Sequence, residues 1–182
     1  MKGAVFTNFQ EMIEDEFGME CWEKLLEKCD LPSGGIYTSA ATYDDQEILS
    51  LVGALSEYSS VPVPTLVEAF GRYLYNGLAS SLPASMMDYP DLWSLLDSVD
   101  SVIHVEVNKL YPDALTPKII VTEKHQNGIT LYYQSPRKMC LLAVGLVHKA
   151  AESFGTPVTI KHTCCMNDGA DHCSMLVELE QV

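Results

Sequence analysis

The sequence predicts an α+β domain, with a helical N-terminal part and a C-terminal β-β-α-β-β part built around an antiparallel sheet. Two observations carry this prediction. Apolar residues recur at helical spacing over about the first 110 residues. Beyond Tyr111-Pro112 the pattern changes to short β-rich segments that flank turn signals. The length of 182 residues suits one domain, which we expect to span residues 1–182.

Five helices are expected in the N-terminal part. Asn8 is the expected N-cap of the first helix, and a second apolar stripe follows after a glycine. Thr42 or Asp44 can cap the third helix, and Pro64 suits the first turn of the fourth. The fifth is expected as one continuous helix over about Asp91–Leu110.

The C-terminal part is predicted from its turns. Lys118–Glu123 and Ile129–Ser135 are β-rich and flank Gln126-Asn127-Gly128, a strong hairpin signal. An almost wholly apolar helix is expected to follow at about Pro136–Phe154, and Gly155 is a natural stop for it. The last expected elements are two strands, Pro157–Cys164 and Ser174–Glu180.

The charge of the chain restricts its partners. Eleven Lys and Arg against 25 Asp and Glu give a formal net charge of −14. Nucleic acids and anionic membrane surfaces require clustered basic residues, so neither is an expected partner. No apolar run approaches the roughly 18 residues of a membrane span, and acidic residues follow too early for a secretory signal peptide. We therefore expect a cytoplasmic protein.

Two features could carry chemistry. Tyr133, Ser135 and Arg137 alternate along a strand and so point to one face, where their donors would suit carboxylates. A solvated polar strand edge is the alternative. His104 lies at the edge of an apolar helix face, which is how proteins present a proximal ligand to haem iron. A partly buried histidine in a helix–helix contact is the plainer interpretation.

Together these features match a known family. The stretch HVEVNKLYPDALTP (His104–Pro117), followed by YYQSPR (Tyr132–Arg137), resembles the H-NOX family of haem nitric oxide/oxygen binding domains. The opening MKGAVFTNFQEMIEDEFG also matches the N-terminus of this family, and the resemblance covers essentially the whole chain. It implies that haem b is enclosed between a helical distal part, about residues 1–62, and a proximal part, about residues 63–182.

The resemblance also implies roles for particular residues. His104 would be the proximal ligand of a five-coordinate ferrous haem. Tyr133, Ser135 and Arg137 would hold the haem propionates, and Pro117 would press on the porphyrin and distort it. The residues expected to line the distal pocket are Val5, Phe9, Leu78 and Leu142.

The distal pocket favours one gas over another. Family members that bind oxygen stably carry a distal tyrosine five residues after the motif arginine, and here that position is Leu142. Bound dioxygen needs such a donor, whereas nitric oxide on ferrous iron does not. The leucine at this position therefore predicts a nitric oxide sensor that excludes oxygen. Tyr73 and Tyr75 are the residues that could supply a donor from elsewhere.

The expected function is gas sensing rather than catalysis. Nitric oxide, and also carbon monoxide, would bind the haem, and with nitric oxide the bond from His104 to iron would weaken or break and the helix bearing His104 would shift. The chain has no kinase, cyclase or phosphodiesterase motif. By resemblance, the regulated partner is a histidine kinase or a cyclic-di-GMP synthase or phosphodiesterase. The alternatives are a haem enzyme, such as a peroxidase or oxygen-activating catalyst, and a zinc-dependent hydrolase.

A second site is expected near the C-terminus. His162-x-x-Cys165, then Cys173 and the more distant Cys140, resemble a structural zinc site that some bacterial family members carry. Cys164 and His172 are competing ligands, because strand alternation places His162 and Cys164 on one face. Reduced buried cysteines or a labile disulfide are the alternatives to zinc. Thiolate ligands would add a redox input.

Overall fold

The computed structural model describes residues 1–83, 86 and 88–180. Its helices are α1 (Gly3–Phe17), α2 (Met19–Lys28), α3 (Asp45–Ser59), α4 (Val63–Ser81), α5 (Leu92–Ser98), α6 (His104–Leu110) and α7 (Cys140–Ser153). Its strands are β1 (Lys118–His125), β2 (Gly128–Gln134), β3 (Val158–Cys164) and β4 (Cys173–Leu179). Among the described helices, none combines the length and hydrophobicity that a bilayer-spanning segment needs.

The first helix begins earlier than predicted, because backbone contacts start it in place of a side chain. The amides of Gly3 and Ala4 donate to the carbonyls of Ala41 and Ser39, at 2.8 and 3.0 Å, so a distant loop satisfies the first turn. Asn8 lies inside α1, where its side-chain Nδ2 donates to the Ala4 carbonyl at 2.8 Å. The prediction of Asn8 as N-cap was therefore wrong.

Other helix ends follow the sequence. Asp44 caps α3 by accepting the Gln46 amide at 2.9 Å, and Pro64 lies in the first turn of α4. α7 begins at Cys140 rather than Pro136, because Lys138 has a left-handed φ of 52° and residues 135–138 form a turn. No side chain caps the N-terminus of α7.

The expected helix over 91–110 is present and contains a π-turn. α5 ends at Ser98, the π-helical turn runs over Val99–Ile103, and α6 begins at His104. The His104 amide donates to the Val99 carbonyl, five residues back, which is the π pattern. The sequence did not predict this turn, and π-turns inside helices are frequent at functional sites.

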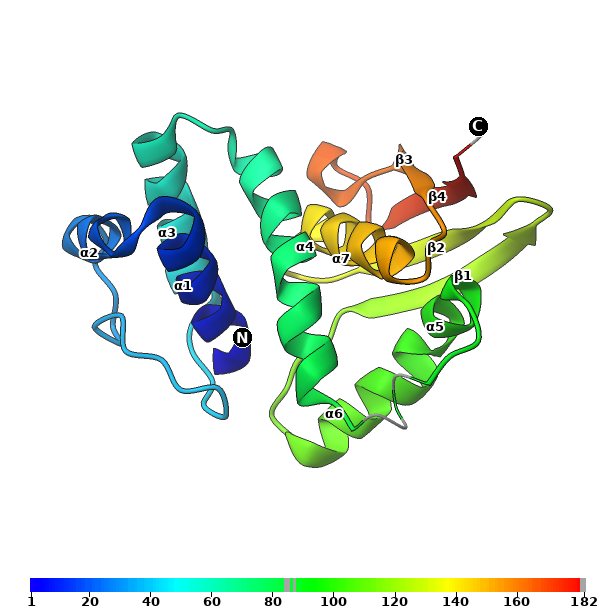
Figure 1. Ribbon diagram of the computed structural model, residues 1–182, viewed down its shortest axis with the longest axis horizontal. Helices are drawn as coiled ribbons and strands as arrows, with labels where there is room; N and C mark the ends of the chain where they lie inside the picture. Colours follow the sequence, from blue (N-terminus) through cyan, green and yellow to red (C-terminus); the bar gives the residue numbers. More distant parts are fainter. Residues whose placement is uncertain (84–85, 87, 181–182) are drawn as a thin grey trace.

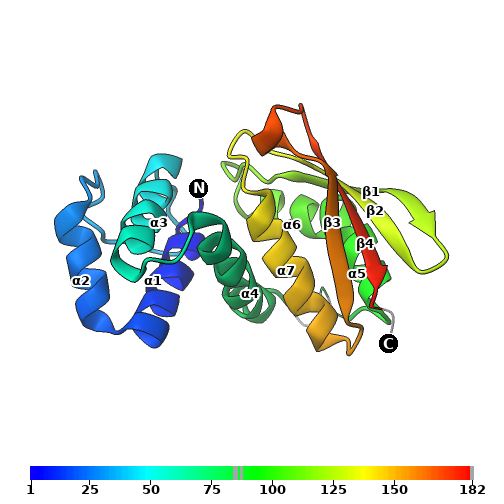
Figure 2. The same cartoon turned by 90° about the horizontal axis from the view of Figure 1, so that it is seen from above.

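The four strands form one antiparallel sheet in the order β1-β2-β4-β3. The helices α5, α6 and α7 lie on the same side of this sheet, and α4 separates α7 from the bundle of α1, α2 and α3 (Figures 1 and 2). The helical N-terminal part and the antiparallel β-β-α-β-β part confirm the α+β fold class.

Two hydrophobic clusters make up the core. One joins α1 to α4 and includes Phe9 and Phe70, whose rings lie 4.9 Å apart. The other joins the sheet to α5 and α7. Leu141 packs against both clusters, so both clusters share α7, and they also share α4, whose Tyr75 packs against the second cluster. α4 and α7 touch at Gly71 and Gly145, where neither backbone leaves room for a β-carbon.

Candidate functional site

His104 is presented at the start of α6, directly after the π-turn. Its side chain is 15% exposed, and its Nδ1 lies 3.3 Å from Oδ1 of Asp100. Burial lowers the pKa of His104 below its usual value, and the Asp100 carboxylate opposes this only in part. His104 is therefore neutral near pH 7. With Nδ1 facing a carboxylate, Nε2 is the nitrogen whose lone pair remains for a metal.

Arg137 lies in the turn between β2 and α7 and links the two halves of the chain. Its Nε donates to Oδ2 of Asp45 at 2.7 Å, and an Nη1 proton goes to the Leu115 carbonyl at 2.6 Å. Burial alone would raise the pKa of Asp45, but the N-terminal ammonium and Arg137 together hold it below its usual value. A guanidinium has five N–H donors, so Arg137 keeps others for an anion.

Tyr133 and Ser135 are each 3% exposed, and Ser135 lies two residues before Arg137, directly after the end of β2. Burial, more than any other cause, raises the pKa of Tyr133 to about 12, so its hydroxyl stays a donor at all physiological pH values. Ser135 accepts the Arg137 amide through Oγ at 3.3 Å, which leaves its own proton free to donate. Burial argues against a solvated strand edge.

Pro117 immediately precedes β1. Two residues further along, the Ile119 amide lies 3.4 Å from the same Asp100 oxygen that faces His104. The start of β1, which Pro117 precedes, is therefore connected to His104 through Asp100.

The four expected distal residues are associated with one hydrophobic cluster. Phe9 belongs to the N-terminal cluster, and Val5, Leu78 and Leu142 pack against it. The two tyrosines that could have supplied a donor face elsewhere. The Tyr73 hydroxyl donates to Asp15 at 2.6 Å, and the Tyr75 hydroxyl lies 3.2 Å from Ser153 Oγ. Among the described residues, the expected lining is wholly apolar.

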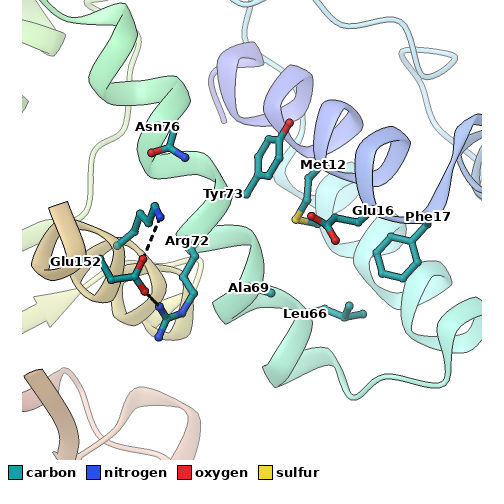
Figure 3. Close-up of a pocket in the computed structure, with 10 residues that line it drawn as sticks. Met12, Glu16, Phe17, Leu66, Ala69, Arg72, Tyr73, Asn76 and Glu152 are labelled. Atoms are coloured by element: carbon teal, nitrogen blue, oxygen red, sulfur yellow. Dashed lines mark hydrogen bonds and ion pairs between the residues drawn. The ribbon is translucent and has the colours of Figure 1, made fainter. Parts of the chain in front are cut away.

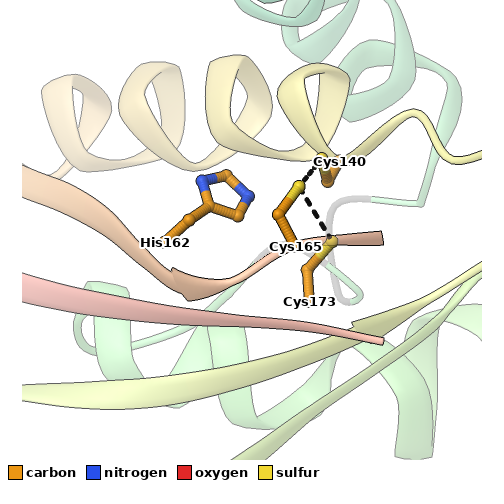
Figure 4. Close-up of side chains that lie close together, drawn as sticks. All are labelled: Cys140, His162, Cys165 and Cys173. Atoms are coloured by element: carbon orange, nitrogen blue, oxygen red, sulfur yellow. Dashed lines mark hydrogen bonds between the residues drawn. The ribbon is translucent and has the colours of Figure 1, made fainter. Parts of the chain in front are cut away.

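The four expected zinc ligands also gather. One ligand atom each from Cys140, His162, Cys165 and Cys173 lies within 4.8 Å of the others, and Figure 4 shows the imidazole directed at the thiols. Within the described part of the chain, His162 Nε2 is buried and has no hydrogen-bond partner. Burial is the largest cause that raises the pKa of Cys140 to about 12. A cation would remove both penalties.

The competing ligands pair with each other instead. Cys164 Sγ lies 3.6 Å from His172 Nε2, and His172 Nδ1 lies 2.5 Å from Asp171 Oδ1. The pairing register of β3 shifts between His162 and Cys164, so strict alternation does not hold there. All six cysteines are free, and no disulfide forms among the residues that the structure describes.

A separate surface pocket of about 420 Å³ opens between α1, α4 and α7 (Figure 3). Its floor is apolar, and Glu152 pairs at its rim with Arg72 and Lys149. None of the residues expected to bind haem or zinc lines it.

A family model described as Haem-NO-binding matches residues 2–162 of this chain. The chain belongs to the H-NOX family. An H-NOX protein from S. oneidensis, solved in the Fe(II)NO state, is 39% identical over 100% of both chains with a TM-score of 0.92. An IWP-051-bound H-NOX from Shewanella woodyi is 44% identical over 99% of this chain and 95% of that one, with a TM-score of 0.84.

The H-NOX family also links this chain to larger proteins. The soluble guanylate cyclase gcy-35 of Caenorhabditis elegans is 25% identical over 169 residues, which are 88% of this chain and 24% of that protein. The chain thus spans about a quarter of the length of this relative. H-NOX domains bind haem and gases and are sensors rather than catalysts, which confirms the prediction of a non-enzymatic domain.

Sequence reasoning missed two carboxylates. Asp100 lies four residues before His104, a spacing that could have marked it as a neighbour on the same helix face. Asp45 lies 92 residues from Arg137, and no local pattern announces that pair.

Proposed function

We propose that this chain is a haem-based nitric oxide sensor, with His104 as the ligand of the haem iron. Bound haem supplies a ferrous iron that binds nitric oxide or carbon monoxide. The observation that carries the proposal is the presentation of His104: a neutral, largely buried imidazole with a carboxylate on Nδ1 and Nε2 left for a metal.

The other residues suit the rest of the cofactor. Tyr133, Ser135 and Arg137 offer donors that match the two propionates. Pro117 would press on the porphyrin from the proximal side. About residues 1–62 would form the distal part and about residues 63–182 the proximal part. The two hydrophobic clusters meet at α7, where Leu141 packs against both of them.

Gas selection follows from the distal side. Val5, Phe9, Leu78 and Leu142 supply no hydrogen-bond donor there, and the Tyr73 and Tyr75 hydroxyls are bonded elsewhere. Dioxygen carries partial negative charge when bound and needs a donor, whereas nitric oxide does not. The protein therefore selects nitric oxide and remains free of oxygen in air.

Signal output comes from movement of α6. When nitric oxide weakens or breaks the bond to His104, α6 shifts and changes the surface that a partner contacts. We propose a histidine kinase or a cyclic-di-GMP synthase or phosphodiesterase as that partner, in the cytoplasm, where reducing conditions preserve six free thiols.

We also propose that Cys140, His162, Cys165 and Cys173 bind a structural zinc ion. Three thiolates and one imidazole fill a tetrahedral site and leave no position for water, which argues against hydrolase chemistry. Two further donors support the thiolates. The Met166 amide points at Cys173 Sγ at 3.2 Å, and Asn167 points at Cys140 Sγ at 3.4 Å. Oxidation of the thiolates would release the metal and give a redox input.

An absorption spectrum of the reduced protein tests the main proposal. In air it should be that of five-coordinate ferrous haem, and addition of nitric oxide should shift it. A stable oxygen spectrum, or no haem at all in protein produced with haem supplied, would contradict the assignment.

A further inference from the structure

The carboxylate of Asp100 contacts two elements at once. Its Oδ1 lies 3.3 Å from Nδ1 of His104 at the start of α6 and 3.4 Å from the amide of Ile119 on β1. A single oxygen thus joins the helix that bears the histidine to the edge strand of the sheet.

Asp100 and His104 lie four residues apart, a spacing that places two side chains on one face of a helix. A π-turn runs over Val99–Ile103, and the His104 amide donates to the Val99 carbonyl. Asp100 lies within this turn and His104 directly follows it.

Asp100 also differs from the acidic residue one turn earlier. Asp97 pairs with Lys124 at 2.8 Å, on the exposed surface. Asp100 has no Lys or Arg partner within the ranges described, and the side chain that it contacts is the neutral imidazole of His104. The negative charge of Asp100 is therefore directed at the imidazole instead of being neutralised by a cation.

We propose that Asp100 is a positioning residue, which holds the proton of His104 on Nδ1, aims Nε2 at the haem iron and ties α6 to β1. This inference rests on the proposed role of His104. A carboxylate that accepts a hydrogen bond from the Nδ1–H group makes the imidazole a stronger electron donor through Nε2. Asp100 thereby sets the strength of the bond that nitric oxide must weaken.

The test compares Asp100→Asn, Asp100→Ala and the matched control Asp97→Asn in the haem-loaded protein. The first readout is the iron–histidine stretching frequency of the ferrous, unligated form. Asn keeps an oxygen for both contacts but removes the charge, so its frequency should fall below that of the wild type. Asp97→Asn should leave it unchanged.

The second readout is the rate of haem transfer to an acceptor protein. Asp100→Ala should accelerate haem loss about tenfold, because loss of a partner behind a metal-binding histidine costs 10- to 100-fold in affinity. If Asp100→Ala does not fold, the iron–histidine stretching frequency of Asp100→Asn decides the test. Wild-type frequency in both Asp100 variants, with haem loss as in Asp97→Asn, would overturn the proposal.

A third measurement separates this inference from the proposed function. The tautomer of His104 is read from nitrogen chemical shifts of the full chain without haem. The wild type should carry its proton on Nδ1, and Asp100→Ala should move it largely to Nε2. If the wild type binds no haem, the proposed function fails while this result still supports or overturns the role of Asp100. An unchanged tautomer would overturn that role.

Discussion

The two histidines with proposed metal roles have opposite surroundings. His104 has one carboxylate behind it and no other ligating side chain in its group, whereas His162 lies with three thiols whose sulfurs are all within 4.8 Å of its ring nitrogen. A single protein ligand leaves the metal bond free to lengthen without disturbing a set of other ligands. Four ligands from three elements close a site and hold those elements together. The proposed bond from His104 to iron could therefore change when a gas binds, whereas the proposed zinc site would stay intact.

The largest effect should come from removing the lone ligand. His104→Gly should lose haem almost completely unless imidazole is supplied, because His104 is the one protein ligand proposed for the iron. Zinc content should not change. Haem per chain, measured by absorbance with and without imidazole, checks this. Normal haem content and an unaltered ferrous spectrum without imidazole would show that another residue ligates the iron.

A second set of variants tests the proposed zinc site. Replacing Cys140, His162, Cys165 or Cys173 by alanine should lose zinc but leave haem largely in place. The matched controls are Cys164→Ala and His172→Ala, which change the same residue types beside the cluster and should keep the metal. Elemental analysis of anaerobically prepared protein decides. Absence of zinc from the wild type would end the proposal, and retention in Cys140→Ala would remove α7 from the site.

A smaller effect is expected at the propionate donors. Arg137→Ala should speed haem loss more than Ser135→Ala, because a charge-assisted bond contributes about 1.5–3 kcal/mol against about 1 for a neutral one. Arg137→Ala also breaks the pair with Asp45. Asp45→Asn is therefore the control, since it weakens that pair and keeps the guanidinium. Equal haem-loss rates for the Arg137 and Ser135 variants would refute the ranking.

The smallest change should be a gain of oxygen binding. Leu142→Tyr adds a hydroxyl to a distal cluster that has no donor, so the ferrous protein should acquire some oxygen affinity. Leu142→Phe adds similar bulk without the hydroxyl and should gain none. Spectra in air of the wild type and both variants compare them. A stable oxygen complex of the wild type would reveal a donor outside the expected lining.

Features set by neighbouring residues were predictable from the sequence. The Asn127-Gly128 turn, the Asp44 cap and the Pro64 helix start depend on a few adjacent residues, and all three occur in the structure. The start of α1 was not predictable, because its first amides bond to a loop nearly 40 residues away. The Arg137–Asp45 pair was hidden for the same reason.

The candidate sites also combine features that neighbouring residues predict with features that the folded structure alone reveals. The spacing around His104 indicated its place on a helix, but not the contact of Asp100 with the Ile119 amide, because that contact joins residues on two different elements. The π-turn before His104 was not predicted either. At the cysteine cluster, strict strand alternation favoured Cys164 as a partner of His162. A shift in the pairing of β3 directs Cys164 to His172 instead.

The uncapped start of α7 gives the zinc site a thermodynamic meaning. The first residue of this helix is Cys140, and no side chain accepts its free amides. Negative thiolate charge at that end is favourable to the helix dipole. The Cys140 thiolate would thus stabilise the start of α7, and the free energy of zinc binding to it would count toward folding of this helix. By mass action that contribution is RT ln(1 + [Zn]/Kd). Opening of the helix shared by both hydrophobic clusters would then depend on the concentration of free zinc.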